Sequence, residues 1–279
     1  MSNMTKEELM RELSEKHGIT EFKSESRKQR DMKYMERKIL QDDKRFSWQD
    51  TINQVAIKNQ LSDIQKGALL IMSTFLEFNG DGKLFDTKGG KLTVNKLAPL
   101  IRRDTRTAKR IVTECENIGA LTTHKEGKET IITFTDMLYK CGETLKGTAE
   151  RFVKVYKLSV RELVGKFTLK EIGFLSDLLP HFHWKTHILC ENPTEMDSNK
   201  IKVWRRKDII EKLRYNKDFV YETMNKFKRN LVTIEISSAI DLICLSPNLV
   251  SRQEYKVTLE KIEEVAHSIA DNPQGISYL

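Results

Sequence analysis

The most chemically distinctive part of the sequence is a group of cations between Leu100 and Gly119. Its arginine, lysine and threonine side chains stand at Arg102, Arg103, Thr105, Arg106, Lys109, Arg110 and Thr113. Guanidinium and ammonium groups donate hydrogen bonds to phosphate oxygens and to base edges, and threonine hydroxyls donate to either. Asp104 is the only acidic residue among these positions, so the group favours an anionic ligand.

A single helix can carry this group. Asp104 is a suitable N-cap, and Gly119 can end the helix in a left-handed turn. A step of 100° per residue gathers the apolar side chains on one face: Ala108, Ile111, Val112, Cys115 and Ile118. The opposite face holds Arg106, Lys109, Arg110, Thr113 and Asn117. The alternative is an ordinary solvated surface helix, because amphipathic helices commonly have charged outer faces.

The neighbouring elements decide between these alternatives. A capping box of Ser62 and Gln65 opens a helix that should end at the Asn79-Gly-Asp-Gly82 cluster. Short strands are predicted at 83–86 and 91–93, and a helix from 94 to about 101. Strands at 121–125 and 130–135 then flank a turn, with Lys125 and Lys128 near its tip. This order predicts a winged helix-turn-helix, with the basic helix in the major groove and the hairpin along the DNA backbone.

The same order of elements recurs from about residue 151 to 248. Thr168 and Glu171 can cap a helix, and β segments are predicted near 186–190 and 201–204. A helix pair at 206–214 and 217–229 and a hairpin of 231–236 with 241–246 complete the repeat. The predicted fold is therefore mainly α with small β hairpins, an α+β protein with two tandem winged-helix units at 61–145 and 150–250.

Three phrases in the sequence resemble a known family: Arg151-Phe-Val-Lys-Val-Tyr-Lys157, Phe167-Thr-Leu-Lys-Glu-Ile-Gly-Phe-Leu175 and Arg205-Arg-Lys-Asp-Ile-Ile-Glu-Lys-Leu213. Together with the paired units, they look like the RepL-type replication initiators of Firmicute plasmids and phages. The resemblance covers about residues 61–248. It implies binding of double-stranded DNA and a role in replication initiation.

The second unit has a different charge pattern from the first. Its second helix presents Asp218 and Glu222 on the outer face, where acidic groups would meet phosphates. Three cations at the entrance could still form a phosphate clamp, Arg205, Arg206 and Lys207, with Lys217 nearby as a further candidate for DNA contact. Either this unit contacts DNA, or it serves as a dimer or partner surface.

The ends of the chain suggest further contacts. Residues 1–60 are expected to form a charged helical arm, which is either solvated or part of a partner interface. A final helix is predicted from 253 to 272, with a loose tail in the segment up to 279. Its apolar stripe packs on its own unit or pairs two subunits, so a homodimer through this helix, the arm or the second unit is an open expectation.

Composition narrows the class of protein. The chain of 279 residues has a net charge of +8 and a pI near 9.1, which favour a polyanionic partner. Its four cysteines are widely spaced, as expected of reduced thiols. The sequence shows neither an apolar signal core nor a membrane span, so a cytoplasmic location without membrane contact is expected.

Other site chemistries fit the sequence poorly. The cluster of His181, His183, His187 and Cys190 lacks a common zinc-finger spacing and is expected to be packing residues. The Asn79-Gly-Asp-Gly82 cluster departs from the calcium-loop pattern, and no nucleophile–base spacing stands out. We therefore expect no cofactor, no metal and no enzyme activity. The expected function is sequence-specific DNA binding in replication initiation or transcriptional control, the alternative being an interaction module for an acidic partner.

Overall fold

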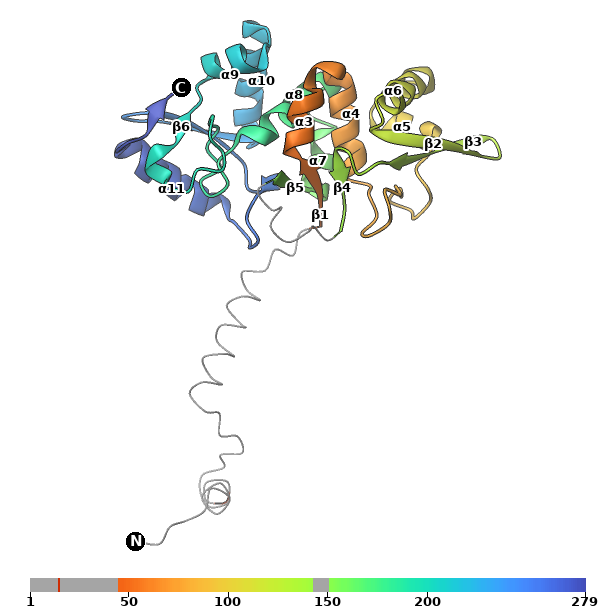
Figure 1. The fold of residues 1–279 in the computed structure, drawn as a ribbon, viewed down its shortest axis with the longest axis horizontal. Coiled ribbons are helices and arrows are strands. Elements are labelled where there is room, and N and C mark those ends of the chain that lie inside the picture. The colour runs from red at the N-terminus through yellow and green to blue at the C-terminus, as the bar shows by residue number, and fades with distance from the viewer. Residues whose placement is uncertain (1–14, 16–44, 143–150) are drawn as a thin grey trace. The chain divides into compact units, whose positions relative to one another are not determined.

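The computed structural model describes residue 15 and residues 45–142 and 151–279 of the chain (Figure 1). It is an α+β structure of helices and small sheets. Of the described residues, 45–142, 151–253 and 257–279 belong to one compact unit, and the description below concerns that unit. The helices predicted in the arm before residue 45 lie outside the described residues.

The first half of the unit begins with a strand and two helices and ends with a helix pair and a hairpin. Its elements are β1 (Phe46–Asp50), α3 (Thr51–Ile57), α4 (Asp63–Ser73), α5 (Val94–Leu100), α6 (Thr105–Asn117), β2 (Leu121–Glu126), β3 (Glu129–Phe134) and β4 (Tyr139–Lys140). The predicted capping box of Ser62 and Gln65 is present at α4. The strands predicted at 83–86 and 91–93 are isolated bridges instead, such as Leu84 with Leu76 and Thr93 with Ile131.

The second half repeats this order. Its elements are β5 (Phe152–Tyr156), α7 (Lys157–Leu163), α8 (Leu169–Leu178), β6 (Lys202–Val203), α9 (Arg206–Leu213), α10 (Lys217–Arg229), β7 (Thr233–Ser237), β8 (Asp241–Leu245) and β9 (Val250–Ser251). The capping box of Thr168 and Glu171 is confirmed at α8. Of the β segments predicted at 186–190 and 201–204, only β6 is a strand, and 188–190 form bridges.

A four-stranded sheet joins the two halves, with strand order β4-β1-β5-β9. At its centre β1 and β5 are antiparallel, and Trp48 lies opposite Lys154. The strand order is symmetric about this central pair, since β4 follows the hairpin of the first half and β9 follows that of the second. The repeat in the sequence is therefore matched by an approximate two-fold relation between the halves.

Helices α4 and α8 pack closely beside this sheet, and a glycine on each permits the approach. A Cβ atom on Gly67 would lie 2.1 Å from the carbonyl oxygen of Leu169, and one on Gly173 would lie 1.9 Å from that of Asp63. Each glycine thus meets the first residue of the opposite helix. The contact repeats the two-fold relation seen in the sheet.

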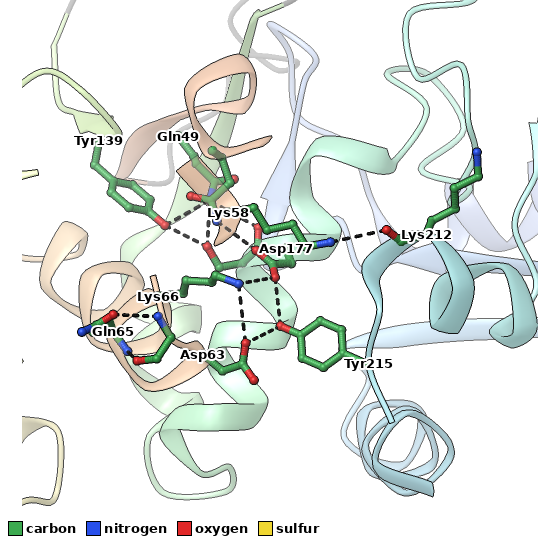
Figure 2. A network of polar contacts seen from close by, with 12 residues as sticks. Gln49, Lys58, Asp63, Gln65, Lys66, Tyr139, Asp177, Lys212 and Tyr215 are labelled. Carbon is green, nitrogen blue, oxygen red and sulfur yellow. Dashed lines mark hydrogen bonds and ion pairs between the residues drawn. The ribbon is translucent and has the colours of Figure 1, made fainter. Parts of the chain in front are cut away.

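A buried polar network crosses the same contact (Figure 2). The Lys66 ammonium lies 2.7 Å from the Asp177 carboxylate, and both side chains are almost fully buried. Tyr215 donates its hydroxyl hydrogen towards Asp63 and Asp177, whose oxygens lie 2.7 and 2.9 Å away. Removing one member would leave a buried charge without its partner, so the network favours this pairing of the halves.

The ends of the unit differ from the sequence expectations. Residues 46–60 form β1, α3 and a 3₁₀ turn, so the expected arm over 1–60 does not extend through this segment. The final helix, α11 (Leu259–Asp271), begins later than the predicted 253, because Thr258 accepts a hydrogen bond from the Lys261 amide and caps it. The tail is not loose, since β10 (Ser277–Tyr278) pairs in parallel with β6.

Candidate nucleic-acid interface

Helix α6 has the two faces that the sequence predicts. The Asp104 carboxylate accepts a hydrogen bond from the Thr107 amide at 2.8 Å, and Gly119 follows the helix with a φ of 76°. Four of the predicted apolar residues are buried: Ala108, Ile111, Val112 and Cys115. The side chains of Arg106, Lys109, Arg110 and Thr113 are exposed, as is Thr105 in the first turn. The α6 cations therefore face solvent.

The β2–β3 hairpin lies against α6. Its strands pair from Leu121 opposite Phe134 to Glu126 opposite Glu129, and Gly127 adopts a φ of 61° at the tip. The Glu116 side chain on α6 accepts a hydrogen bond from the Thr123 amide at 2.6 Å. This contact fixes the hairpin beside the helix, and Figure 1 shows the hairpin extending outward from α5 and α6.

A groove of about 440 Å³ lies between the exposed sides of α6 and the hairpin. Five of the predicted residues line it: Thr105, Lys109, Thr113, Lys125 and Lys128. Asn95 and His124 line it too, although the sequence analysis did not select them. His124 stands next to Lys125 on β2, so the strand pattern could have identified it. The structure thus brings the helix and hairpin groups into one groove, henceforth the α6 groove.

The cations of the α6 groove are not engaged in ion pairs within the described residues. In the described part of the chain, Lys109, Lys125 and Lys128 form no ion pair, and neither does the neighbouring Arg106. Arg110 lies 4.0 Å from Glu114, but both side chains are largely exposed. Exposed pairs of this kind contribute little. The α6 groove therefore contains three lysines without ion pairs and one carboxylate, Glu116, which bonds to Thr123.

Comparisons with family models, with characterised proteins and with solved structures give no match to this chain. The interpretation of the α6 groove therefore depends on its own geometry and charge.

Two further predicted residues, Arg102 and Arg103, lie outside the α6 groove. They occupy the turn between α5 and α6, where Arg102 has a φ of 52°. Both side chains are exposed, and both line a different groove, of about 290 Å³. That groove is also lined by residues 164–168 of the α7–α8 turn and by Leu169 and Ile172 of α8. The predicted first-half residues are therefore split between two grooves, while Arg106 and Arg110 are exposed on α6 and line neither of them.

The second half has a counterpart of the α6 groove, of about 370 Å³, between α10 and the β7–β8 hairpin. It is lined by Arg205, Arg206 and Lys207. The Arg206 guanidinium donates to both carboxylate oxygens of Glu235, at 2.9 and 2.8 Å. Arg205 lies 3.1 Å from Asp208 and stacks on the Tyr278 ring. Two of the predicted cations in the second groove are thus already engaged within the protein.

The outer face of α10 carries the acidic residues that the sequence indicates, together with the exposed cations Lys228 and Arg229. Asp218 and Glu222 are exposed, while Val220, Thr223, Met224 and Phe227 are buried. Lys217, at the start of α10, is exposed but does not line the second groove. The two halves therefore share a fold but present different charges.

The histidine cluster lies within the protein and bonds to the backbone. Nε2 of His183 lies 2.7 Å from the Glu195 carbonyl oxygen, and Nδ1 of His187 lies 3.1 Å from that of Leu245. Burial lowers the pKa of His181 to about 3 and that of His187 to about 4. Burial raises the pKa of the Cys190 thiol to about 12. Among residues 45–142 and 151–279, no three histidine, cysteine or acidic side chains are grouped so as to hold a metal ion.

Two other expectations from the sequence concern the state of the cysteines and the presence of membrane-spanning helices. The four cysteines, Cys115, Cys141, Cys190 and Cys244, are free thiols. No helix within the described ranges has the length and apolar character needed to cross a membrane.

Proposed function

We propose that this chain is a cytoplasmic, sequence-specific, double-stranded DNA-binding protein built from two tandem winged helix-turn-helix units, without enzymatic activity. The first unit is the main reader of DNA. Helix α6 enters the major groove, and the β2–β3 hairpin follows the backbone. The observation that carries the proposal is the α6 groove, in which Lys109, Lys125 and Lys128 lie together. The one acidic residue in its lining, Glu116, accepts hydrogen bonds from Thr123 and forms no ion pair with these lysines among the described residues.

Within this arrangement the basic residues have two roles. Arg106 and Lys109 lie in the first turns of α6, the part of a recognition helix that reaches base edges. Lys125 and Lys128 lie at the hairpin, which suits contacts with phosphate oxygens. Base contacts supply sequence preference, whereas phosphate contacts supply register and most of the salt dependence.

The biological role we propose is replication initiation or transcriptional control. The resemblance to RepL-type initiators supports the first, and the DNA-reading groove serves both equally. Selection of bound fragments from the source genome separates them. Binding sites repeated beside an origin support an initiator, whereas scattered promoter sites support a regulator.

A gel-shift series at rising salt tests DNA binding itself. The proposal predicts a preferred duplex that remains bound better than unrelated duplexes throughout the series. DNA binding that lacks any sequence preference and disappears at a modest salt concentration would instead favour a winged-helix module that binds an acidic protein.

A further inference from the structure

The groove that contains Arg102 and Arg103 joins the two halves of the protein. Arg102 and Arg103 come from the α5–α6 turn of the first half, and Gly165 and Lys166 come from the α7–α8 turn of the second. Lys226, on α10, also lines the groove. The three side chains Arg102, Arg103 and Lys166 are exposed. We call them the inter-half cations.

Local contacts hold both turns in place. The Arg103 amide donates to the Ala98 carbonyl oxygen at 2.9 Å, and Arg102 adopts a left-handed conformation in the same turn. A Cβ atom on Gly165 would lie 3.6 Å from Nη2 of Arg102, so this guanidinium lies against the α7–α8 turn. The Lys166 amide in turn donates to the Leu163 carbonyl oxygen at 2.9 Å. The cations of the two halves are therefore neighbours on fixed backbone.

The charge of the inter-half cations is not balanced within the described residues. None of the three forms an ion pair there, and no acidic residue lines their groove. Lys226 differs, because its ammonium lies 2.8 Å from the Glu171 carboxylate. Like charges in proximity repel one another, and an anion between them would remove that repulsion.

We propose that the inter-half cations hold the backbone of the same duplex that α6 reads. The inference rests on the proposed function. Arg102 and Arg103 directly precede the first turn of α6, so a strand that passes the start of this helix comes next to Lys166. The second half then contributes to DNA binding through its α7–α8 turn rather than through the face of α10 that carries Asp218 and Glu222. This assigns Lys166 a phosphate contact, which positions the duplex without specifying its sequence.

Lys170 provides a matched control for Lys166. It is also an exposed lysine and stands only one turn away on α8, but it does not line the groove. Its ammonium lies 4.3 Å from the centre of the Phe219 ring. Replacement by alanine removes one positive charge in either case, so the two variants separate a local contact from a change in overall charge.

The experiment measures the affinity of the full chain for its preferred duplex against salt concentration, for the wild type and for Lys166→Ala, Lys170→Ala and Lys109→Ala. For Lys166→Ala we expect the slope of log affinity against log salt to fall by about one, with sequence preference unchanged. Lys170→Ala should retain the wild-type slope. Ethylation interference should show that Lys166→Ala loses sensitivity at a phosphate beside the α6 site and keeps it elsewhere.

The outcomes distinguish this inference from the proposed function. A wild-type slope and ethylation pattern for Lys166→Ala, together with weakened binding by Lys109→Ala, would overturn the inference and leave the α6 assignment intact. Equal losses for Lys166→Ala and Lys170→Ala would also overturn it, because overall charge would then account for the effect. If the wild type binds no duplex, the proposed function fails and the inference fails with it.

Discussion

Arg206 and Glu235 form a bidentate ion pair in the groove between α10 and the β7–β8 hairpin, and this pair marks the main difference between the two halves. Both side chains are only 18% exposed, and the guanidinium donates to both carboxylate oxygens. In the α6 groove, none of Lys109, Lys125 and Lys128 forms such a pair within the described residues. The lysines of the α6 groove are therefore without ion pairs, whereas two of the arginines in the corresponding groove of the second half are paired within the protein.

Replacement of Arg206 by alanine should affect stability more than DNA binding. Glu235 would lose its partner in a mostly enclosed site, which should lower the free energy of unfolding by about 1–3 kcal/mol. Affinity for the preferred duplex should change little, because the Arg206 guanidinium already donates hydrogen bonds to Glu235. Chemical denaturation and gel-shift titration measure the two effects. A large loss of DNA affinity in a variant of wild-type stability would show that Arg206 leaves Glu235 to bind DNA.

Replacement of Lys128 by alanine should weaken binding to all duplexes alike. Its side chain stands at the hairpin tip, where we assign a phosphate contact. The salt slope should fall by about one, and the ratio between specific and unrelated duplexes should stay constant. Affinity titrations on both duplexes at several salt concentrations test this. A selective loss on the preferred duplex would instead assign Lys128 to base recognition.

Methyl groups at the α4–α8 contact should destabilise the protein. Gly67→Ala and Gly173→Ala would each place a carbon about 2 Å from a backbone oxygen of the opposite helix, at 2.1 and 1.9 Å. We expect each to lower the free energy of unfolding by about 1–3 kcal/mol, because the helices must separate. Gly165→Ala is the control for stability, since its Cβ atom would find only an ordinary contact at 3.6 Å. Wild-type thermal stability of both helix variants would contradict the described packing.

Stability should fall as the pH decreases below about 6.5, because buried histidines must take up protons. The folded state holds the pKa of His187 at about 4, below its ordinary value of 6.5. The unfolded chain therefore binds more protons between these values, and the stabilisation present above pH 6.5 is lost towards pH 4. His187 should account for roughly 2 kcal/mol of the loss between pH 7 and pH 5.

Chemical denaturation at several pH values measures this dependence. His187→Asn is a suitable variant, since asparagine tolerates the φ of 59° at this position. Its stability should depend less on pH than that of the wild type. An equally steep dependence in the variant would assign the titration to other groups.

Local signals in the sequence were sufficient for the elements that carry the candidate site. The cap at Asp104 and the 3.6-residue period identify α6 and its buried face, and Gly127 marks the hairpin turn. The same signals identify α10 and its acidic face. These elements are defined by neighbours within a few residues, so the sequence contains enough information to place them.

Long-range pairing was not predictable in the same way. The central sheet unites β1 with β5, about a hundred positions later. In β1 the polar residues Ser47 and Gln49 are buried more fully than Phe46 and Trp48, and β5 is buried throughout, so neither strand has the usual alternation of buried apolar and exposed polar residues. The contact of Lys66 with Asp177 and that of Arg206 with Glu235 likewise depend on the tertiary fold. For this reason the sequence pattern groups Arg102 and Arg103 with α6, whereas the structure places them in a groove shared by both halves.

The most direct test of the account measures sequence preference in Arg106→Ala. Arg106 is exposed in the first turn of α6, where a bidentate contact with a guanine is the commonest specific interaction. We expect the variant to lose roughly 1–3 kcal/mol of affinity for the preferred duplex and much less for unrelated duplexes. Competitive gel-shift titration of the wild type and Arg106→Ala on both duplexes measures that difference directly. An unchanged ratio between the two duplexes in Arg106→Ala would contradict the assignment of α6 as the recognition helix.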